Sequence, residues 1–300
     1  MEKILIDVMN VLFLTMSTEV RNLQFSGIYN DLMRKFRDEG HSVYIVYPNE
    51  RRSGLPTTLV NEDGIQCLGV RTLNVQKTNV IEKGIGQLLL ESQFKSALKK
   101  YFQGVKFDLI LYSTPPITFN KVIKYAKKVS GFKSITYLLL KDIFPQNAVD
   151  LGMISKNGIL YKLFRNKEDE LYRISDIIGC MSPANVEYVL RHNPSVNRLK
   201  LEVAPNSYDV PSSFKTIDKE SIRCKYNLPI DKPIFIYGGN MGKPQGIPFL
   251  IDCMSAIKDR EDCHFLLVGD GTEYPKLETF VKKIKSKSVS VFRRLPKEDY

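Results

Sequence analysis

The chain has 300 residues, 43% hydrophobic and 10% aromatic, which suffices for two domains of ordinary size and argues against wholesale disorder. Lysine and arginine total 44 against 33 acidic residues, and the net charge of +11 suits phosphorylated ligands, anionic lipid or nucleic acid, or simply a soluble basic surface. The five cysteines contain no C-x-x-C pair, which argues against a disulfide framework or a zinc site and suits reduced thiols in a cytoplasmic protein.

The beginning of the chain is apolar from Ile4 to Met16, which raises the question of a signal peptide. Asp7 and Asn10 interrupt the run, and no small-residue cleavage site follows it. We therefore expect a buried first strand over 4–8. No stretch of about 18 apolar residues occurs in the sequence, so we expect no membrane-spanning helix.

From there to about residue 204, short apolar stretches alternate with amphipathic ones that place apolar residues on one helical face. The expected strands cover 4–8, 41–47 (ended by Pro48), 107–112, 134–140, 177–181 and 201–204. The expected helices cover 27–39, 119–129, 160–173 and a stretch that begins at Pro183. This alternation predicts an α/β domain in which helices cover both faces of a parallel sheet.

The pattern restarts after a segment rich in turn formers. We expect an N-terminal Rossmann-like domain over 1–206, a linker over 207–219 and a second Rossmann-like domain over 220–300. The expected elements of the second domain are helices over 219–226, 248–257 and 274–284 and strands over 234–237, 264–268 and 288–292. A doubly wound domain usually has five or six strands, so we expect the C-terminal domain to be incomplete.

The first segment with chemical content is 237–246, Tyr-Gly-Gly-Asn-Met-Gly-Lys-Pro-Gln-Gly, between a strand and a helix. Its glycines let the backbone approach a ligand, and the N-terminus of the next helix adds unpaired N–H groups and a positive dipole end. An ordinary glycine-rich turn has the same composition. The candidate diphosphate-binding residues are Gly239, Asn240, Gly242, Lys243, Gln245 and Gly246.

A second glycine turn follows the next strand along the chain. It contains Gly269, Asp270 and Gly271, at the carboxyl end of a strand, where open α/β sheets bind ligands. These three residues are the candidate nucleotide contacts, although many strands end in glycine simply to reverse direction.

Together these two segments resemble those of the group 1, or family 4, glycosyltransferases of the GT-B fold. The N-terminal half agrees with the resemblance through Asp-Leu-Ile at 108–110, the turn Ser-Thr-Pro-Pro at 113–116 and the segment Lys-Asp-Ile-Phe-Pro-Gln-Asn-Ala-Val-Asp-Leu-Gly at 141–152. The last segment is similar to that of the branch that builds bacterial surface polysaccharides, such as lipopolysaccharide or capsule. The resemblance covers essentially the whole chain.

The resemblance implies a retaining transfer from a UDP- or GDP-sugar held mainly by the C-terminal domain. Cationic groups aimed at the departing diphosphate lower the barrier to this step, and Lys243 is the candidate. The sequence has no Asp-x-Asp motif, so we expect no metal and no cofactor besides the donor substrate.

The acceptor or sugar side is expected in the N-terminal domain. Asp142 follows a strand and is the candidate catalytic residue, although an Asp at this place could equally cap the next turn. Ser113 and Thr114, at another strand end, and Ser26 and Gly27, at a helix start, are candidates for contacts with the sugar or the acceptor.

The sequence departs from the family in two ways. Ser26 and Gly27 stand where many relatives have a Gly-Gly loop, and no Glu-x7-Glu pair precedes Tyr300. The alternatives are therefore a truncated inactive chain, a half-enzyme completed by a second polypeptide, or a GT-B sugar-nucleotide epimerase.

The positive charge is concentrated on a few segments. The helix over 119–129 carries Lys121, Lys124, Lys127 and Lys128 and no acidic residue. Such a face suits an anionic inner leaflet and a polyprenyl-linked acceptor, which predicts a cytoplasmic protein bound peripherally to the membrane. A solvated helix face is the alternative, and no recognition helix accompanies the charge to favour nucleic acid.

Overall fold

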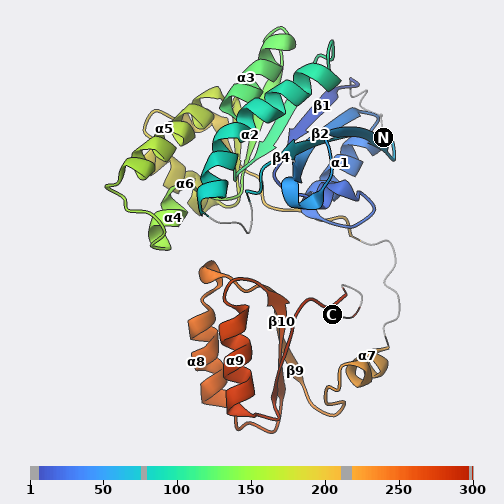
Figure 1. Ribbon diagram of the computed structural model, residues 1–300, viewed down its shortest axis with the longest axis vertical. Coiled ribbons are helices and arrows are strands. Elements are labelled where there is room, and N and C mark those ends of the chain that lie inside the picture. Colours follow the sequence, from blue (N-terminus) through green and yellow to red (C-terminus); the bar gives the residue numbers. More distant parts are fainter. Residues whose placement is uncertain (1–6, 76–79, 211–217, 297–298, 300) are drawn as a thin grey trace. The chain divides into compact units, whose positions relative to one another are not determined.

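The computed structural model describes residues 7–75, 80–210, 218–296 and 299. The chain divides into two compact units, Met1–Val210 and Pro211–Tyr300, each built around its own sheet (Figure 1).

The described part of the first unit contains a sheet of eight strands in the order β3-β4-β2-β1-β5-β6-β7-β8. All neighbours pair in parallel except β3 with β4, which form an antiparallel edge. The strands are β1 Asn10–Leu14, β2 Ser42–Glu50, β3 Thr58–Glu62, β4 Ile65–Thr72, β5 Leu109–Ser113, β6 Ile135–Leu140, β7 Ile177–Cys180 and β8 Leu201–Val203.

Helices cover both faces of this sheet because the central strands are apolar on both sides. Val11 and Phe13 pack with Met33 of α1, whereas Leu12 and Leu14 face the cluster that contains Phe94 of α2. The α-helices of the unit are α1 Ile28–Asp38, α2 Val80–Tyr101, α3 Asn120–Val129, α4 Gln146–Asp150, α5 Ile159–Ile174 and α6 Pro183–His192. The predicted doubly wound parallel sheet is confirmed.

The first strand begins later than predicted. It spans Asn10–Leu14, where four successive side chains from Val11 are fully buried, whereas Val8 is exposed. A strand between two layers needs apolar side chains on both faces, and 11–14 supplies them. The prediction of 4–8 was wrong for residues 7 and 8, and residues 4–6 lie outside the described part of the chain.

The second strand continues past Pro48 to Glu50, so the prediction that Pro48 ends it was wrong. Val46 accepts a hydrogen bond from Thr15, just after β1, and therefore directs its backbone groups toward β1. Backbone groups alternate sides along a strand, so Pro48 also faces that side, beyond the end of β1. Proline has no N–H to donate, and none is needed at this position, because within the described residues no strand pairs with Pro48 on that side.

The second unit has, in its described part, a parallel sheet of three strands in the order β11-β10-β9. Helices α8 and α9 pack against one face through a cluster that includes Leu267 and Leu277. The elements are α7 Lys219–Lys225, β9 Ile234–Asn240, α8 Ile247–Ile257, β10 His264–Asp270, α9 Tyr274–Ile284 and β11 Val289–Phe292. Strand β9 extends beyond the predicted end, so Gly238 and Gly239 belong to the strand.

No helix in the described part of the chain is long and apolar enough to cross a membrane.

Candidate functional site

The strand order of the first unit reverses between β1 and β5. From β1 the chain proceeds to β2 and β4 on one side, and it returns on the other side through β5 and β6. Ligands of such sheets bind beyond the carboxyl ends of the strands at this reversal. Ser113 ends β5, and Asp142 follows the end of β6, so both lie at this edge.

Tyr29, in the first turn of α1, connects these residues, and sequence reasoning missed it. Burial raises the pKa of Tyr29, a hydrogen bond with Ser113 opposes this, and the charges of Asp142 and Glu19 raise it further. The start of α1 and the ends of β5 and β6 therefore lie close together. A tyrosine just after a glycine N-cap was the available signal, but only the strand order shows which strand ends it faces.

Thr114 holds the loop that carries Asp142. Its hydroxyl donates to the carbonyl of Asp142 at 3.1 Å and accepts from the N–H groups of Lys141 at 3.1 Å and Asp142 at 3.3 Å. The residue is buried, so its hydroxyl positions the loop. Contact of Thr114 with sugar hydroxyls, as predicted, would compete with these three bonds.

The Asp142 carboxyl group lies at the protein surface, and partial desolvation raises its pKa. The capping role considered from the sequence has no support among the described residues, because α4 shows no side-chain cap at its N-terminus. The carboxyl group is therefore available to an incoming ligand.

Ser26 and Gly27 open α1, but Asp31 occupies their donors. The Asp31 carboxylate accepts from Ser26 Oγ at 3.0 Å and from the Gly27 N–H at 3.0 Å, and it pairs with Arg34 at 2.6 Å. Desolvation raises the pKa of Asp31, but these bonds and one from the Asp209 N–H outweigh it and lower the pKa. A second anion at this helix start would face the Asp31 charge.

A groove of about 280 Å³ lies between α1 and strands β5 and β6 and ends beside Lys141. Its lining is largely apolar, with Leu32, Phe36 and Leu111 among the residues and the stretch 204–207 along one border. A sugar phosphate requires polar partners, so the polar edge residues suit such a ligand better than the groove does.

In the second unit, Gly269 and Gly271 allow β9 and β10 to approach closely. A Cβ atom on Gly269 would lie 1.9 Å from the Gly239 carbonyl oxygen, and one on Gly271 would lie 2.4 Å from the Met241 carbonyl oxygen. The Met241 N–H also donates to the Asp270 carbonyl at 3.0 Å. Both glycines thus have a structural requirement that is independent of any nucleotide.

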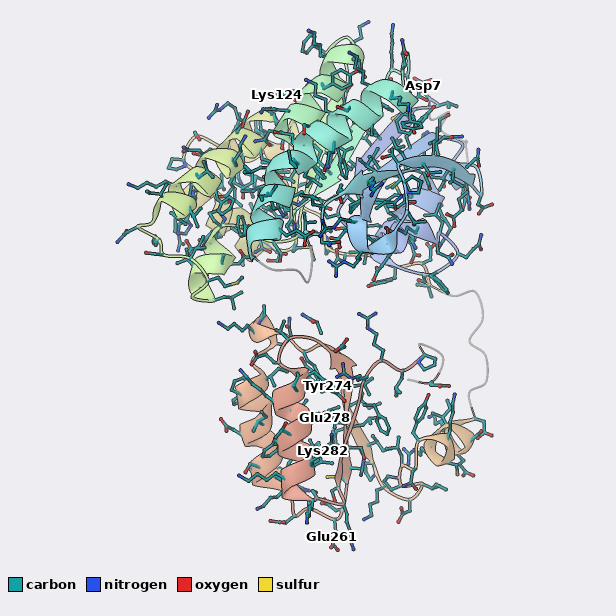
Figure 2. All side chains as sticks on the ribbon, in the orientation of Figure 1. Asp7, Lys124, Glu261, Tyr274, Glu278 and Lys282 are labelled. Carbon is teal, nitrogen blue, oxygen red and sulfur yellow. The ribbon has the colours of Figure 1, made fainter. Side chains whose placement is uncertain are left out.

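Asp270, the third nucleotide-binding candidate, is ion-paired. Its carboxylate lies 3.0 Å from Nη1 of Arg293, whose guanidinium stands over the Tyr274 ring at 4.3 Å. Tyr274 begins α9, along which Glu278 and Lys282 follow on the same side (Figure 2). The carboxyl edge of the second sheet therefore carries an aromatic ring and an exposed arginine, both missed from the sequence.

The polar groups of the 240–246 turn largely satisfy one another. Oε1 of Gln245 accepts from the Gly242 N–H at 3.2 Å and from Asn240 Nδ2 at 3.1 Å. Gly246 adopts the left-handed conformation, with φ of 61°, and caps α8. The hydrogen bonds among Asn240, Gly242 and Gln245 thus stabilise the conformation of the turn.

Two kinds of group remain for an anion at this turn. Lys243 is exposed, and no ion pair to it occurs within the described residues. The first turn of α8 offers the N–H group of the exposed Phe249, since Ile247 is fully buried and Pro248 has no N–H. A lysine beside a helix N-terminus is an arrangement that binds phosphate groups.

Three of the four α3 lysines, predicted to face a membrane, are engaged within the protein. Their ion pairs are Lys121 with Glu91 at 3.8 Å, Lys124 with Glu170 at 2.6 Å and Lys127 with Asp176 at 2.6 Å. Lys124 is labelled in Figure 2. The helix has no acid of its own, but neighbouring elements supply the acids, so α3 is not the uncompensated basic face that its sequence suggested.

Within the described residues, no group of three or more His, Cys, Asp or Glu side chains could hold a metal ion.

Comparisons with known proteins relate this chain to glycosyltransferases. No family model matches it. A probable glycosyltransferase, WbjE of Pseudomonas aeruginosa, is 23% identical over 278 residues, which are 92% of this chain and 66% of that protein. The chain thus spans about two thirds of the length of this relative.

Solved structures share the fold at low identity. The catalytic domain of starch synthase IV from Arabidopsis thaliana, bound to ADP and acarbose, has a TM-score of 0.69 at 12% identity, covering 97% of this chain and 75% of its own. Anabaena HepE in complex with UDP and glucose has a TM-score of 0.57 at 14% identity, covering 96% and 70%. The chain thus has the GT-B fold of these structures, and its sequence is similar to that of a probable glycosyltransferase over most of its length.

Proposed function

We propose that the protein transfers a sugar, with retention of configuration, from a UDP- or GDP-sugar to a polyprenyl-linked glycan acceptor in surface polysaccharide synthesis. The similarity of segment 141–152 to the surface-polysaccharide branch supports the pathway. The UDP bound by HepE supports a nucleotide-sugar donor.

The observation that carries the proposal is the exposed Lys243, which begins the 3₁₀ turn Lys243–Gln245 directly before α8. Departure of the nucleoside diphosphate develops negative charge on the phosphate oxygens. Lys243 and the N–H group of Phe249 would stabilise that charge, and one such contact is worth roughly 3–4 kcal/mol in comparable sites. These protein groups would take the role that a divalent cation plays in other glycosyltransferases.

The acceptor side is proposed at the carboxyl edge of the first sheet. Asp142 presents a carboxyl group there, and Thr114 holds its loop. A carboxylate at this place would accept a hydrogen bond from an acceptor hydroxyl and orient it. The nearby Tyr29 would contact the sugar, and the buried Ser113 would position the Tyr29 hydroxyl.

The donor half of the proposal is tested by calorimetric titration of the protein with UDP and with GDP. Lys243→Ala should weaken binding of the preferred nucleotide by roughly 100-fold, because a charge-assisted contact to the diphosphate is lost. Lys283→Ala is the matched control, since Lys283 is an exposed lysine in the last turn of α9, at the opposite edge of the same sheet. Equal affinities of wild type and Lys243→Ala would refute this donor site.

A further inference from the structure

An apolar projection follows the loop that carries Asp142. We call residues 151–164 the α4–α5 tip, which comprises the connection after α4 and the first turns of α5. Figure 1 shows α4 and this connection at the margin of the first unit. The large exposed apolar side chains of the tip are Met153 at 59%, Ile159 at 85%, Leu160 at 58% and Leu163 at 50% exposure.

Helical geometry places three of these side chains together. Ile159 and Leu163 are one turn apart on α5, and Leu160 lies beside them, so they form a continuous stripe. Phe164 is turned inward, with its ring centroid 5.0 Å from that of Phe144. Phe164 therefore packs toward the core of the unit, whereas the side chains of the stripe are exposed to solvent.

The charges of the tip are all of one sign. It contains Lys156 and Lys162 and no acidic residue. Both lysines are exposed, and within the described residues neither forms an ion pair. In this respect they differ from Lys121, Lys124 and Lys127 of α3, whose charges are compensated inside the unit.

We propose that the α4–α5 tip docks the protein on an anionic lipid bilayer. Exposed aliphatic side chains flanked by lysines are the composition of segments that lie in a bilayer interface, with the alkyl stems in the headgroup region and the ammonium groups on anionic lipids. A protein partner fits less well, because lysine is depleted in protein interfaces and leucine is rare among their energetic hot spots.

The tip is continuous with the proposed acceptor side. It lies at the carboxyl edge of the sheet, because it follows β6, and the Phe144–Phe164 contact fixes it to the loop that begins at Asp142. Docking here would bring Asp142 to the bilayer surface, where a polyprenyl-linked sugar resides. The role of the surface in acceptor delivery rests on the proposed function, whereas the docking itself does not.

The test is co-flotation of the protein with vesicles of mixed phosphatidylglycerol and phosphatidylethanolamine, compared with vesicles of phosphatidylcholine alone. Wild type should float with the anionic vesicles and far less with the neutral ones. Ile159→Gln combined with Leu163→Gln should lower the partition coefficient by roughly tenfold or more, since two aliphatic side chains no longer insert. Lys156→Gln combined with Lys162→Gln should reduce binding to anionic vesicles only.

Leu199→Gln is the matched control. Leu199 is 91% exposed but precedes β8, at the amino edge of the sheet, and its replacement should leave flotation unchanged. Wild type that floats with neither vesicle, or a double glutamine variant that floats as wild type does, would overturn the proposal. An Ile159- and Leu163-dependent dimer in gel filtration, without flotation, would assign the tip to a second copy of the chain. Titration with UDP is unaffected by any of these results, so failure of docking and failure of the donor site remain distinguishable.

Discussion

At the scale of single residues, the proposed acceptor side depends on Asp142. Its pKa is raised by desolvation, so the carboxyl group ionises above the ordinary value of about 3.9. If the carboxylate orients the acceptor, the rate of transfer increases as the pH rises through this raised pKa and is lost below it.

Asp142→Asn should lower kcat by roughly 100-fold while the affinity for the donor nucleotide stays unchanged, because the variant keeps the loop but not the charge. Asp150→Asn, at the exposed end of α4, is the control and should retain activity. Steady-state kinetics across the acidic range checks both statements. An Asp142→Asn enzyme with the wild-type rate and the same acidic limb would remove Asp142 from the reaction.

Lys124 has a structural role that is not evident from the sequence around it. Its hydrogen bond to Glu170 lowers the pKa of that carboxyl to about 2, with Asn120 as a further donor. A carboxyl group with a lowered pKa stabilises the fold above its unfolded-state pKa, and this contribution disappears as the pH falls through the folded-state value.

Lys124→Gln should therefore lower the free energy of unfolding by about 1 kcal/mol at neutral pH, since the pair is partly exposed. The difference from wild type should shrink between about pH 4.5 and 2, where Glu170 is protonated in the unfolded chain first. Urea denaturation at several pH values measures it. Lys128→Gln is the control, and a difference that does not depend on pH would contradict the assignment.

At the scale of elements, the glycines at the carboxyl end of β10 can be explained either by packing or by ligand binding. The sequence marks Gly269 and Gly271 as nucleotide contacts, a prediction that remains open. The close backbone approach between β9 and β10 already requires both of them. A glycine motif at a strand end can thus serve packing and binding together.

Gly271→Ala should destabilise the second unit by about 3 kcal/mol without any ligand, because the added methyl group would overlap the Met241 carbonyl. Gly246→Asn is the comparison, since its Cβ meets open space and asparagine tolerates the left-handed conformation. Thermal unfolding of both variants decides the point. Equal melting temperatures for Gly271→Ala and wild type would show that the strands can separate at little cost.

The arrangement of elements was largely predictable from the sequence, since buried strands and amphipathic helices carry distinct periods. The hairpin of β3 and β4 was missed, although Asp63-Gly64, with φ of 53° and 81°, is a strong turn signal. Strand β9 was placed too short because glycine is a weak indicator of a strand.

The candidate sites were predictable as segments but not as hydrogen-bond networks. The sequence located the turn around Gly242 and the start of α1 at Gly27. It could not show that Gln245 and Asp31 take the N–H groups of those glycines, because a polar side chain chooses its partner only once the chain is folded. Only when these internal hydrogen bonds are known can Lys243 and the first turn of α8 be identified as the groups that remain for an anion.

At the scale of the whole molecule, only part of the positive charge behind the net charge of +11 can attract a partner. Three of the four lysines of α3 are compensated within the first unit, whereas within the described residues those of the α4–α5 tip form no ion pair. The charge that matters for a partner is thus the part without an internal counterion, and bulk composition cannot separate the two.

The proposed activity of the protein is the transfer of a sugar from a nucleotide donor to an acceptor. NMR of the protein with UDP- and GDP-sugars, in the presence and absence of a polyprenyl-linked acceptor, tests it most directly. We predict release of the nucleoside diphosphate that depends on the acceptor and a new glycosidic bond with the anomeric configuration of the donor. An epimerised nucleotide sugar formed without acceptor, or a donor that stays intact in every mixture, would contradict the claim.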